Sequence, residues 1–163
     1  MIRALRDLHL QENKRRFPSL PDYARVIPAY SDKTANGLTK CIIDFLKLSG
    51  HQAERISVTG RYIDNSKVVT DVIGHQRRIG SGKWIAPSMQ PGTADISAVI
   101  HGRAVKVEIK IGKDTQSAAQ KQYQQQVEQA GGLYVIAESF EQFLNWYRIM
   151  FPGSGVTPKI NER

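Results

Sequence analysis

Two alternating segments joined by a two-residue turn constrain the fold of this chain most strongly. In residues 93–100 and 103–111, side chains of opposite character alternate, as in strands with one buried face. His101 and Gly102 lie between these segments, and glycine at the second position of a two-residue loop favours a β-hairpin. In such a hairpin, paired residues have numbers that sum to 203, and Asp95 lies opposite Glu108.

The two faces of this hairpin differ in chemistry because neighbouring side chains point to opposite faces of a strand. One face is wholly apolar and consists of Ile96, Ala98, Ile100, Val105, Val107, Ile109 and Ile111. The other face carries Asp95, Ser97, Val99, Lys106, Glu108 and Lys110. We therefore expect the apolar face to pack on the core and the two carboxylates to lie beside Lys110 on the opposite face.

Opposed carboxylates repel each other, which destabilises a sheet unless a cation lies between them. Their oxygen ligands suit Mg²⁺ or Mn²⁺. Lys110 can orient or deprotonate a metal-bound water and stabilise charge on a phosphorane. We therefore predict a divalent-metal site for phosphodiester hydrolysis at Asp95, Glu108 and Lys110. The alternative is a solvated strand face on which Lys106 and Lys110 neutralise the carboxylates.

Helices and shorter strands are expected around the hairpin, giving an α/β fold with a small mixed sheet flanked by helices. Helical periodicity predicts helices over 34–49, 116–130 and 139–150, and a short one within 3–16. Strands are expected over 56–64, 68–73 and 133–137 and around Trp84, with a basic, glycine-rich loop over 74–82. We predict a basic N-terminal extension (1–33), one domain (34–150) and a tail (151–163).

Composition indicates a soluble protein with a polyanionic partner. No apolar stretch is long enough to span a bilayer and the start does not resemble a signal peptide, so we expect an intracellular, cytoplasmic protein with no membrane partner. The net charge of +8 favours a nucleic acid. Arg77, Arg78 and Lys83, with Trp84 beside them, are candidates to contact it. For Trp84 the alternative is core packing.

Several motifs together carry a resemblance to a known family. They are Gly92-Thr93-Ala94-Asp95, Glu108-Ile109-Lys110, and Gln116-Ser117 with Gln120 at a helix start. This pattern resembles the PD-(D/E)XK nuclease superfamily, in particular its VRR-NUC and Holliday-junction-resolvase-like branch. The resemblance implies a restriction-endonuclease-like fold over residues 34–147. It also implies metal ligation by Asp95, Glu108 and the backbone carbonyl of Ile109, a catalytic Lys110, and Gln120 reaching the same site.

The chain departs from the family pattern in two places. Many relatives carry an acid on the first helix; here Asn36 is the best substitute, through its amide oxygen or a water. Ala94 replaces the common proline. The family pattern favours a site role for Gln120 alone among the glutamines of its helix. Ser117 can bind phosphate or cap that helix.

The expected function is therefore metal-dependent hydrolysis of DNA, selecting structure more than sequence, by a chain that can form a homodimer. The sequence does not separate DNA from RNA. One alternative is a catalytically weak or inactive nuclease-fold protein that binds nucleic acid. Another is a basic RNA-binding protein whose carboxylate pair is incidental.

Overall fold

The computed structural model describes residues 1–56, 60–85 and 90–153 of the chain. These residues belong to two compact units, one built from residues 1–56 and 92 onward and the other from residues 57–91. Within the described ranges, no helix combines the length and apolarity needed to cross a membrane.

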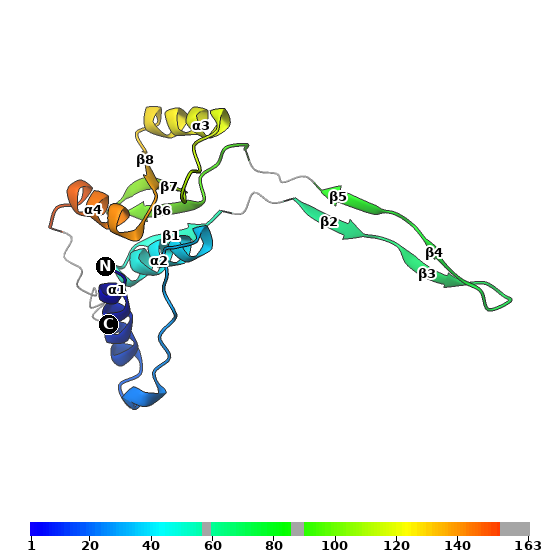
Figure 1. Cartoon of the computed structure of the whole chain (residues 1–163), viewed down its shortest axis with the longest axis horizontal. Helices are drawn as coiled ribbons and strands as arrows, with labels where there is room; N and C mark the ends of the chain where they lie inside the picture. The colour runs from blue at the N-terminus through cyan, green and yellow to red at the C-terminus, as the bar shows by residue number, and fades with distance from the viewer. Residues whose placement is uncertain (57–59, 86–89, 154–163) are drawn as a thin grey trace. The chain divides into compact units, whose positions relative to one another are not determined.

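The larger unit is a mixed α/β structure with a small mixed sheet flanked by helices (Figure 1). The strands lie in the order β1-β6-β7-β8, in which β8 runs parallel to β7 and the other neighbours are antiparallel. The strands are β1 (Gln52–Arg55), β6 (Ile96–Ile100), β7 (Arg103–Ile109) and β8 (Leu133–Ala137). The helices are α1 (Ile2–Arg16), η1 (a 3-10 turn, Asp22–Ala24), α2 (Ala35–Leu48), α3 (Ala118–Gln129) and α4 (Phe140–Met150).

The central hairpin has the register predicted from the sequence. The partners of β6 and β7 run from Ile96 and Val107 at one end to Ile100 and Arg103 at the other, so their numbers sum to 203. His101 and Gly102 have φ angles of 48° and 79°. Positive φ at both central residues defines the type I′ turn, whose twist matches that of the flanking strands.

The apolar face of this hairpin packs on the core, as expected. Its buried side chains join those of α1, α2 and α4 in one hydrophobic cluster. Helix α1, expected within a basic extension, contributes Leu5 and Leu8 to that cluster. Helix α3 approaches the opposite face, where the Tyr123 ring contacts the Tyr134 ring of β8 with centroids 6.4 Å apart. The polar face of the hairpin therefore lies on the α3 side of the sheet.

Helix starts follow the expected capping chemistry. Thr34, Ser117 and Ser139 each accept a hydrogen bond from a backbone amide in the first turn of α2, α3 and α4. Such caps satisfy amides that have no partner within the helix. The predicted helices over 34–49, 116–130 and 139–150 are thus confirmed to within two residues at each end.

The smaller unit is built from four short strands. These are β2 (Arg61–Asp64), β3 (Lys67–Thr70), β4 (Gln76–Ile79) and β5 (Gly82–Ile85). Strand β2 pairs with β5, and β3 pairs with β4, both antiparallel. Neither pair belongs to the four-stranded sheet.

Three sequence expectations are wrong here. The expected loop over 74–82 contains strand β4, whose four residues are all exposed, so no burial pattern in the sequence indicated a strand there. The strand expected over 56–64 is not continuous, since β1 ends at Arg55 and β2 begins at Arg61; residues 57–59 lie outside the described residues. The strand expected over 68–73 ends at Thr70. Beyond it, Asp71 Oδ1 accepts from the amides of Ile73 (3.0 Å) and His75 (2.9 Å) and forms a turn.

Candidate active site

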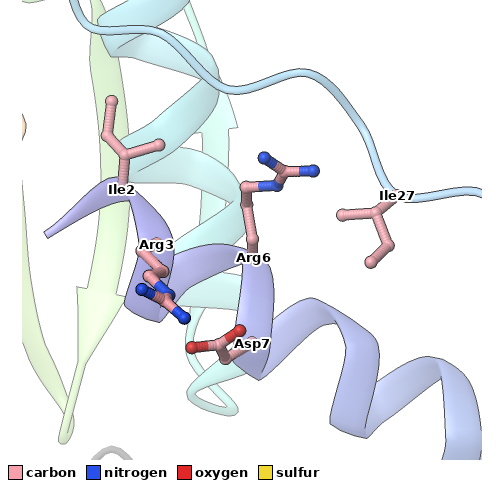
Figure 2. Close-up of a pocket in the computed structure, with 5 residues that line it drawn as sticks. All are labelled: Ile2, Arg3, Arg6, Asp7 and Ile27. Carbon is pink, nitrogen blue, oxygen red and sulfur yellow. The ribbon is translucent and has the colours of Figure 1, made fainter.

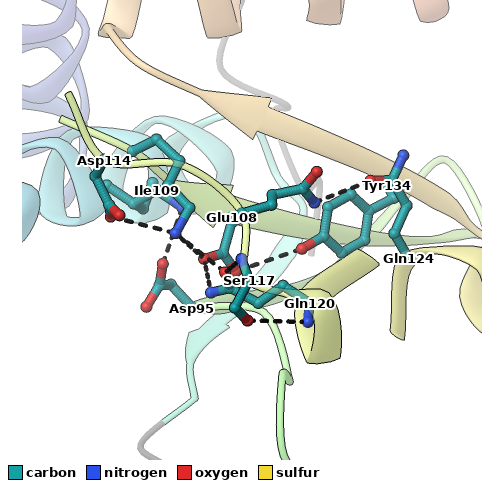
Figure 3. Close-up of polar contacts among 10 residues, drawn as sticks. Asp95, Glu108, Ile109, Asp114, Ser117, Gln120, Gln124 and Tyr134 are labelled. Carbon is teal, nitrogen blue, oxygen red and sulfur yellow. Dashed lines mark hydrogen bonds and ion pairs between the residues drawn. The ribbon is translucent and has the colours of Figure 1, made fainter. Parts of the chain in front are cut away.

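Four residues predicted for the site meet at one end of the central hairpin (Figure 3). Asp95 immediately precedes β6, and its carbonyl accepts from the amide of Ile56 (2.8 Å). Glu108 lies near the end of β7, and the amide of Lys110 just beyond donates to the carbonyl of Ala137 (3.0 Å). Sheet pairing on both sides therefore holds the backbone that carries these groups, and Gln120 reaches them from the first turn of α3.

Glu108 is buried, with 2% of its surface exposed. One carboxylate oxygen, Oε1, accepts from Gln120 Nε2 and lies 3.2 Å from Lys110 Nζ. The other, Oε2, accepts from the Tyr134 hydroxyl at 3.4 Å. Burial, and then the nearby charge of Asp95, raise the pKa of Glu108 above its ordinary value in spite of Lys110. The structure thus brings the two carboxylates close enough to repel each other electrostatically.

Lys110 is also buried and has three oxygen partners. Its Nζ lies 3.2 Å from Glu108 Oε1, 3.2 Å from Asp114 Oδ2 and 3.1 Å from Gln120 Oε1. Burial pushes the pKa of Lys110 down, but the hydrogen bonds to Asp114 and Glu108 outweigh it and the pKa is raised. The raised pKa favours the ammonium form of Lys110, which supplies positive charge and a proton. It argues against the expected role of Lys110 in deprotonating a metal-bound water.

Asp95 is held differently from Glu108. Its Oδ2 accepts from the amide of Ile109 at 2.9 Å. Lys106, which was the other candidate to neutralise the carboxylates, donates to Ser97 Oγ at 2.6 Å. Within the described ranges, no lysine or arginine forms an ion pair with Asp95. Only one part of the solvated-face alternative is found: Lys110 pairs with Glu108, but both side chains are buried rather than solvated.

Gln120 links the start of α3 to this cluster. Its side-chain oxygen, Oε1, accepts from the backbone amide of Ser117 (2.8 Å). The backbone amide of Gln120 donates to Ser117 Oγ (3.3 Å), and the two hydrogen bonds form a capping box. Gln120 Oε1 also accepts from Lys110, while its side-chain nitrogen donates to Glu108. One side chain therefore fixes both the helix terminus and the charged pair. The capping role predicted for Ser117 is confirmed, and its phosphate role stays a prediction.

Two other glutamines near Gln120, Gln116 and Gln124, contact each other and Glu128. Gln116 Nε2 donates to Gln124 Oε1 (2.9 Å), and Gln124 Nε2 donates to Glu128 Oε1 (2.8 Å). Gln116 also forms a hydrogen bond with Tyr134, whereas Gln120 contacts Glu108 and Lys110 directly. A site role for Gln120 alone stays a prediction.

Gly92, in the segment before Asp95, packs closely against the N-terminus of α3. A Cβ at this position would lie 2.7 Å from the amide nitrogen of Gln120 and would overlap the backbone of Ala119. Its φ is 82°, a conformation that favours glycine. Glycine therefore permits the close approach of the two segments that carry Asp95 and Gln120.

Two residues of the cluster were not foreseen from the sequence. Asp114 follows Lys110 by four positions in the loop before α3, and Tyr134 comes from β8. An acid four residues after a lysine is a weak signal in a loop. Tyr134 could have been found only from the parallel register of β8, which pairs Lys106 with Tyr134 and Glu108 with Ile136.

The donor set fits a hard divalent cation only in part. Asp95 and Glu108 supply two carboxylates, and the backbone of Ile109 lies beside Asp95. Among the described residues there is no group of three or more His, Cys, Asp or Glu side chains arranged to hold a metal. Asn36 adds no contact to the cluster, because its Oδ1 accepts from Arg55 Nη2 at 2.9 Å. Mg²⁺ commonly takes one or two carboxylates and keeps several waters, which suits this pair.

The predicted nucleic-acid contacts Arg77, Arg78, Lys83 and Trp84 all lie in the smaller unit. Trp84 has 62% of its surface exposed, so the core-packing alternative for it is wrong. Arg78 pairs with Asp64, its Nη2 lying 2.7 Å from Asp64 Oδ2, whereas Arg77 forms no ion pair with any described residue.

A cavity of about 460 Å³ lies elsewhere in the larger unit, along α1 (Figure 2). It is lined by Ile2, Arg3, Arg6, Asp7 and Ile27. None of the residues predicted for the candidate active site lines it.

The fold and the site define a mixed α/β protein with a buried carboxylate–lysine cluster at the end of its central hairpin. In comparisons with known proteins, no family model and no curated sequence matched the chain.

Proposed function

We propose that this protein is a metal-dependent nuclease that hydrolyses phosphodiester bonds in DNA, on a restriction-endonuclease-like fold. The observation that carries the proposal is the convergence of Asp95, Glu108, Lys110 and Gln120 from three separate segments on one end of the sheet. Chance pairing of a Glu-x-Lys tripeptide with a solvated strand would not bury its glutamate and lysine together.

Electrostatics supports a cation at this place. The raised pKa of Glu108 and the raised pKa of Lys110 both mean that the metal-free cluster holds protons more tightly than ordinary side chains do. A divalent cation held by Asp95, Glu108 and the carbonyl of Ile109 would remove the repulsion between the carboxylates. Bound Mg²⁺ or Mn²⁺ would lower the pKa of a water ligand and polarise a phosphoryl oxygen.

The protein side chains have separable roles in this proposal. Lys110, protonated in the cluster, supplies positive charge and a proton donor where negative charge develops on the phosphoryl group. Gln120 positions Lys110 and Glu108 relative to each other through its two amide atoms. Tyr134 orients the second oxygen of Glu108.

The net charge of +8 supports a polyanionic substrate. We propose that the substrate is DNA, recognised by its structure rather than its sequence. We propose further that the protein acts as a homodimer, which would bind two DNA strands.

Cleavage of labelled branched, nicked, single-stranded and duplex DNA, with Mg²⁺, Mn²⁺ or EDTA, tests the proposal. We expect metal-dependent products from wild type and none from Lys110→Ala. Lys106→Ala is the matched control, because Lys106 lies on the same face of β7 but contacts Ser97 rather than the carboxylates. It should cleave like wild type.

Two results would contradict the proposal. Cleavage that persists in EDTA, or equally in Lys110→Ala, would show that this cluster is not the catalytic site. Binding of DNA without cleavage under any metal would instead support a nuclease fold that only binds nucleic acid.

A further inference from the structure

The four strands of the smaller unit share one continuous register. Partners in β2 and β5 have residue numbers that sum to 146, as Arg61 and Ile85 do, and partners in β3 and β4 have the same sum. No residue is therefore gained or lost between the two pairs of strands. A Cβ at Gly80 would lie 3.1 Å from the Cα of Ser66, the partner that this register gives it. The strands form one long two-stranded ribbon (Figure 1).

One face of this ribbon pairs cations with β-branched aliphatic side chains. Because the register is continuous and side chains alternate, the odd-numbered residues of all four strands share a face. Each of its cross-strand pairs joins one cation to one aliphatic residue: Arg61 with Ile85, Lys83 with Ile63, Lys67 with Ile79, and Arg77 with Val69. We call this the basic–aliphatic face.

The other face is different in charge. It carries Tyr62 opposite Trp84, and its one cation, Arg78, is neutralised by Asp64 (2.7 Å) and also donates to Ser66 Oγ (2.6 Å). The four cations of the basic–aliphatic face form no ion pair with any residue in the described ranges. The sequence pattern alone, which groups Arg77 with Arg78, does not show this separation.

The basic–aliphatic face is unfavourable in water without a partner. Val69, Ile79 and Ile85 keep 41%, 50% and 40% of their surface exposed, and an isolated two-stranded ribbon is only marginally stable. Cations gathered on one face also repel one another. A polyanion with apolar surface between its charges would remove both penalties, and duplex DNA has this combination in its major groove, where thymine methyl groups lie between two phosphate backbones.

We propose that the basic–aliphatic face binds duplex DNA in the major groove, with its cations on phosphates and its aliphatic side chains against base edges. A two-stranded ribbon fits this groove. On each strand the face covers nine residues, such as Arg61 to Val69, and the eight steps between them span about 27 Å at about 3.4 Å per residue. The inference rests on the proposed function only for the choice of DNA as the polyanion.

Binding of a fluorescein-labelled duplex by the full chain in EDTA, measured against salt concentration, tests this inference independently of cleavage. The test variant replaces Arg61, Lys67, Arg77 and Lys83 by glutamine, which keeps the aliphatic stems. We expect the slope of log affinity against log salt to fall by about 3.6, at about 0.9 for each lost phosphate contact. The proposal corrects the expected DNA contact of Arg78, because Arg78 lies on the other face and pairs with Asp64. The matched control, Asp64→Asn with Arg78→Gln, therefore removes an ion pair outside the proposed interface without changing net charge. Its slope should equal that of wild type.

A second pair of variants tests the aliphatic contribution. Val69→Ser with Ile79→Ser should weaken binding at every salt concentration with the slope unchanged, while Val68→Ser on the other face should bind like wild type. Circular dichroism and size-exclusion chromatography on each variant exclude unfolding or a change in oligomeric state as the cause.

Three results would overturn the inference. The first is an unchanged salt slope in the fourfold variant. The second is tighter binding of single-stranded DNA than of the duplex. The third is a fourfold variant that still binds the duplex but no longer binds anionic phosphatidylserine vesicles or no longer self-associates. Loss of cleavage alone would leave the inference standing, because binding is measured without metal.

Discussion

Replacing Asp95 by asparagine separates a metal ligand from a structural carboxylate. The substitution keeps an oxygen that can accept from the Ile109 amide, now 2.9 Å from Asp95 Oδ2, but makes that hydrogen bond neutral. Hydrogen bonds to charged groups contribute about 1 kcal/mol more than neutral ones. Relief of repulsion with Glu108 offsets up to about 1 kcal/mol. The free energy of unfolding in EDTA should therefore change by less than about 1 kcal/mol, or about 2–4 °C in Tm for a chain of this size.

Metal should distinguish the two proteins clearly. At a Mn²⁺ concentration of about 100 times Kd, wild type should gain about 2.7 kcal/mol, roughly 8 °C at about 3 °C per kcal/mol. If loss of the carboxylate weakens binding tenfold, Asp95→Asn should gain only about 1.4 kcal/mol. Thermal melts followed by circular dichroism, with EDTA and with Mn²⁺, measure both shifts. Glu141→Gln, which removes an exposed carboxylate from the first turn of α4, is the control and should keep the wild-type response to Mn²⁺.

One pattern would refute this reasoning. A wild-type Tm that does not move with Mn²⁺, together with an Asp95→Asn variant destabilised in EDTA by well over 1 kcal/mol, would show that Asp95 is a structural acceptor.

Three further predictions follow from the same contacts. Gly92→Ala should destabilise the protein by about 1–3 kcal/mol and slow cleavage, because a Cβ would overlap the backbone at the N-terminus of α3. Urea unfolding and a cleavage assay measure the two effects, and an unchanged urea midpoint would contradict the prediction. Gln120→Ala should lower kcat more than it raises KM, while Gln124→Ala, altered on the same helix face, should leave both unchanged; equal losses in the two variants would count against a positioning role. Because the folded pKa of Glu108 is raised, the folded state keeps this proton above the pH at which the unfolded chain releases it. The free energy of unfolding in EDTA should therefore fall as pH rises from 4.5, the ordinary pKa of a glutamate, and Glu108→Gln should remove that fall. Thermal melts over a pH series measure this, and an equal dependence of Tm on pH in the two proteins would argue against the prediction.

The central hairpin could be predicted from the sequence because its burial and its chemistry share one period. A face as apolar as the one that includes Ile96 and Ile109 can pack only on the core, and this fixes the side on which Glu108 lies. The turn at His101 and Gly102 then fixes the register, since a shift by one residue would reverse the faces.

The ribbon and part of the site could not be predicted in the same way. Within the described ranges, nearly all side chains of the four ribbon strands are exposed, so burial gives no periodic signal. The cations at Arg77 and Arg78 also look like one cluster in the sequence. Asp114 and Tyr134 reach the carboxylates through a loop path and a parallel strand register. The positions of Asp114 and Tyr134 in the cluster depend on contacts between segments that are distant in the sequence. The local pattern of residues does not predict such contacts. Asn36 was expected near the carboxylates, and its hydrogen bond to Arg55 directs its side-chain oxygen elsewhere.

The fixed register of the ribbon also limits how its length can change by insertion or deletion. Removing one cross-strand pair would turn every residue between the cut and the tip to the opposite side, so that Arg77 would lie with Trp84 instead of with Lys83. Removing two successive pairs would leave the pattern in phase and shorten the reach by about 6.8 Å. Chains descended from a common ancestor with this one should therefore differ in ribbon length by even numbers of residues on each strand. An odd difference should be accompanied by a bulge that restores the phase.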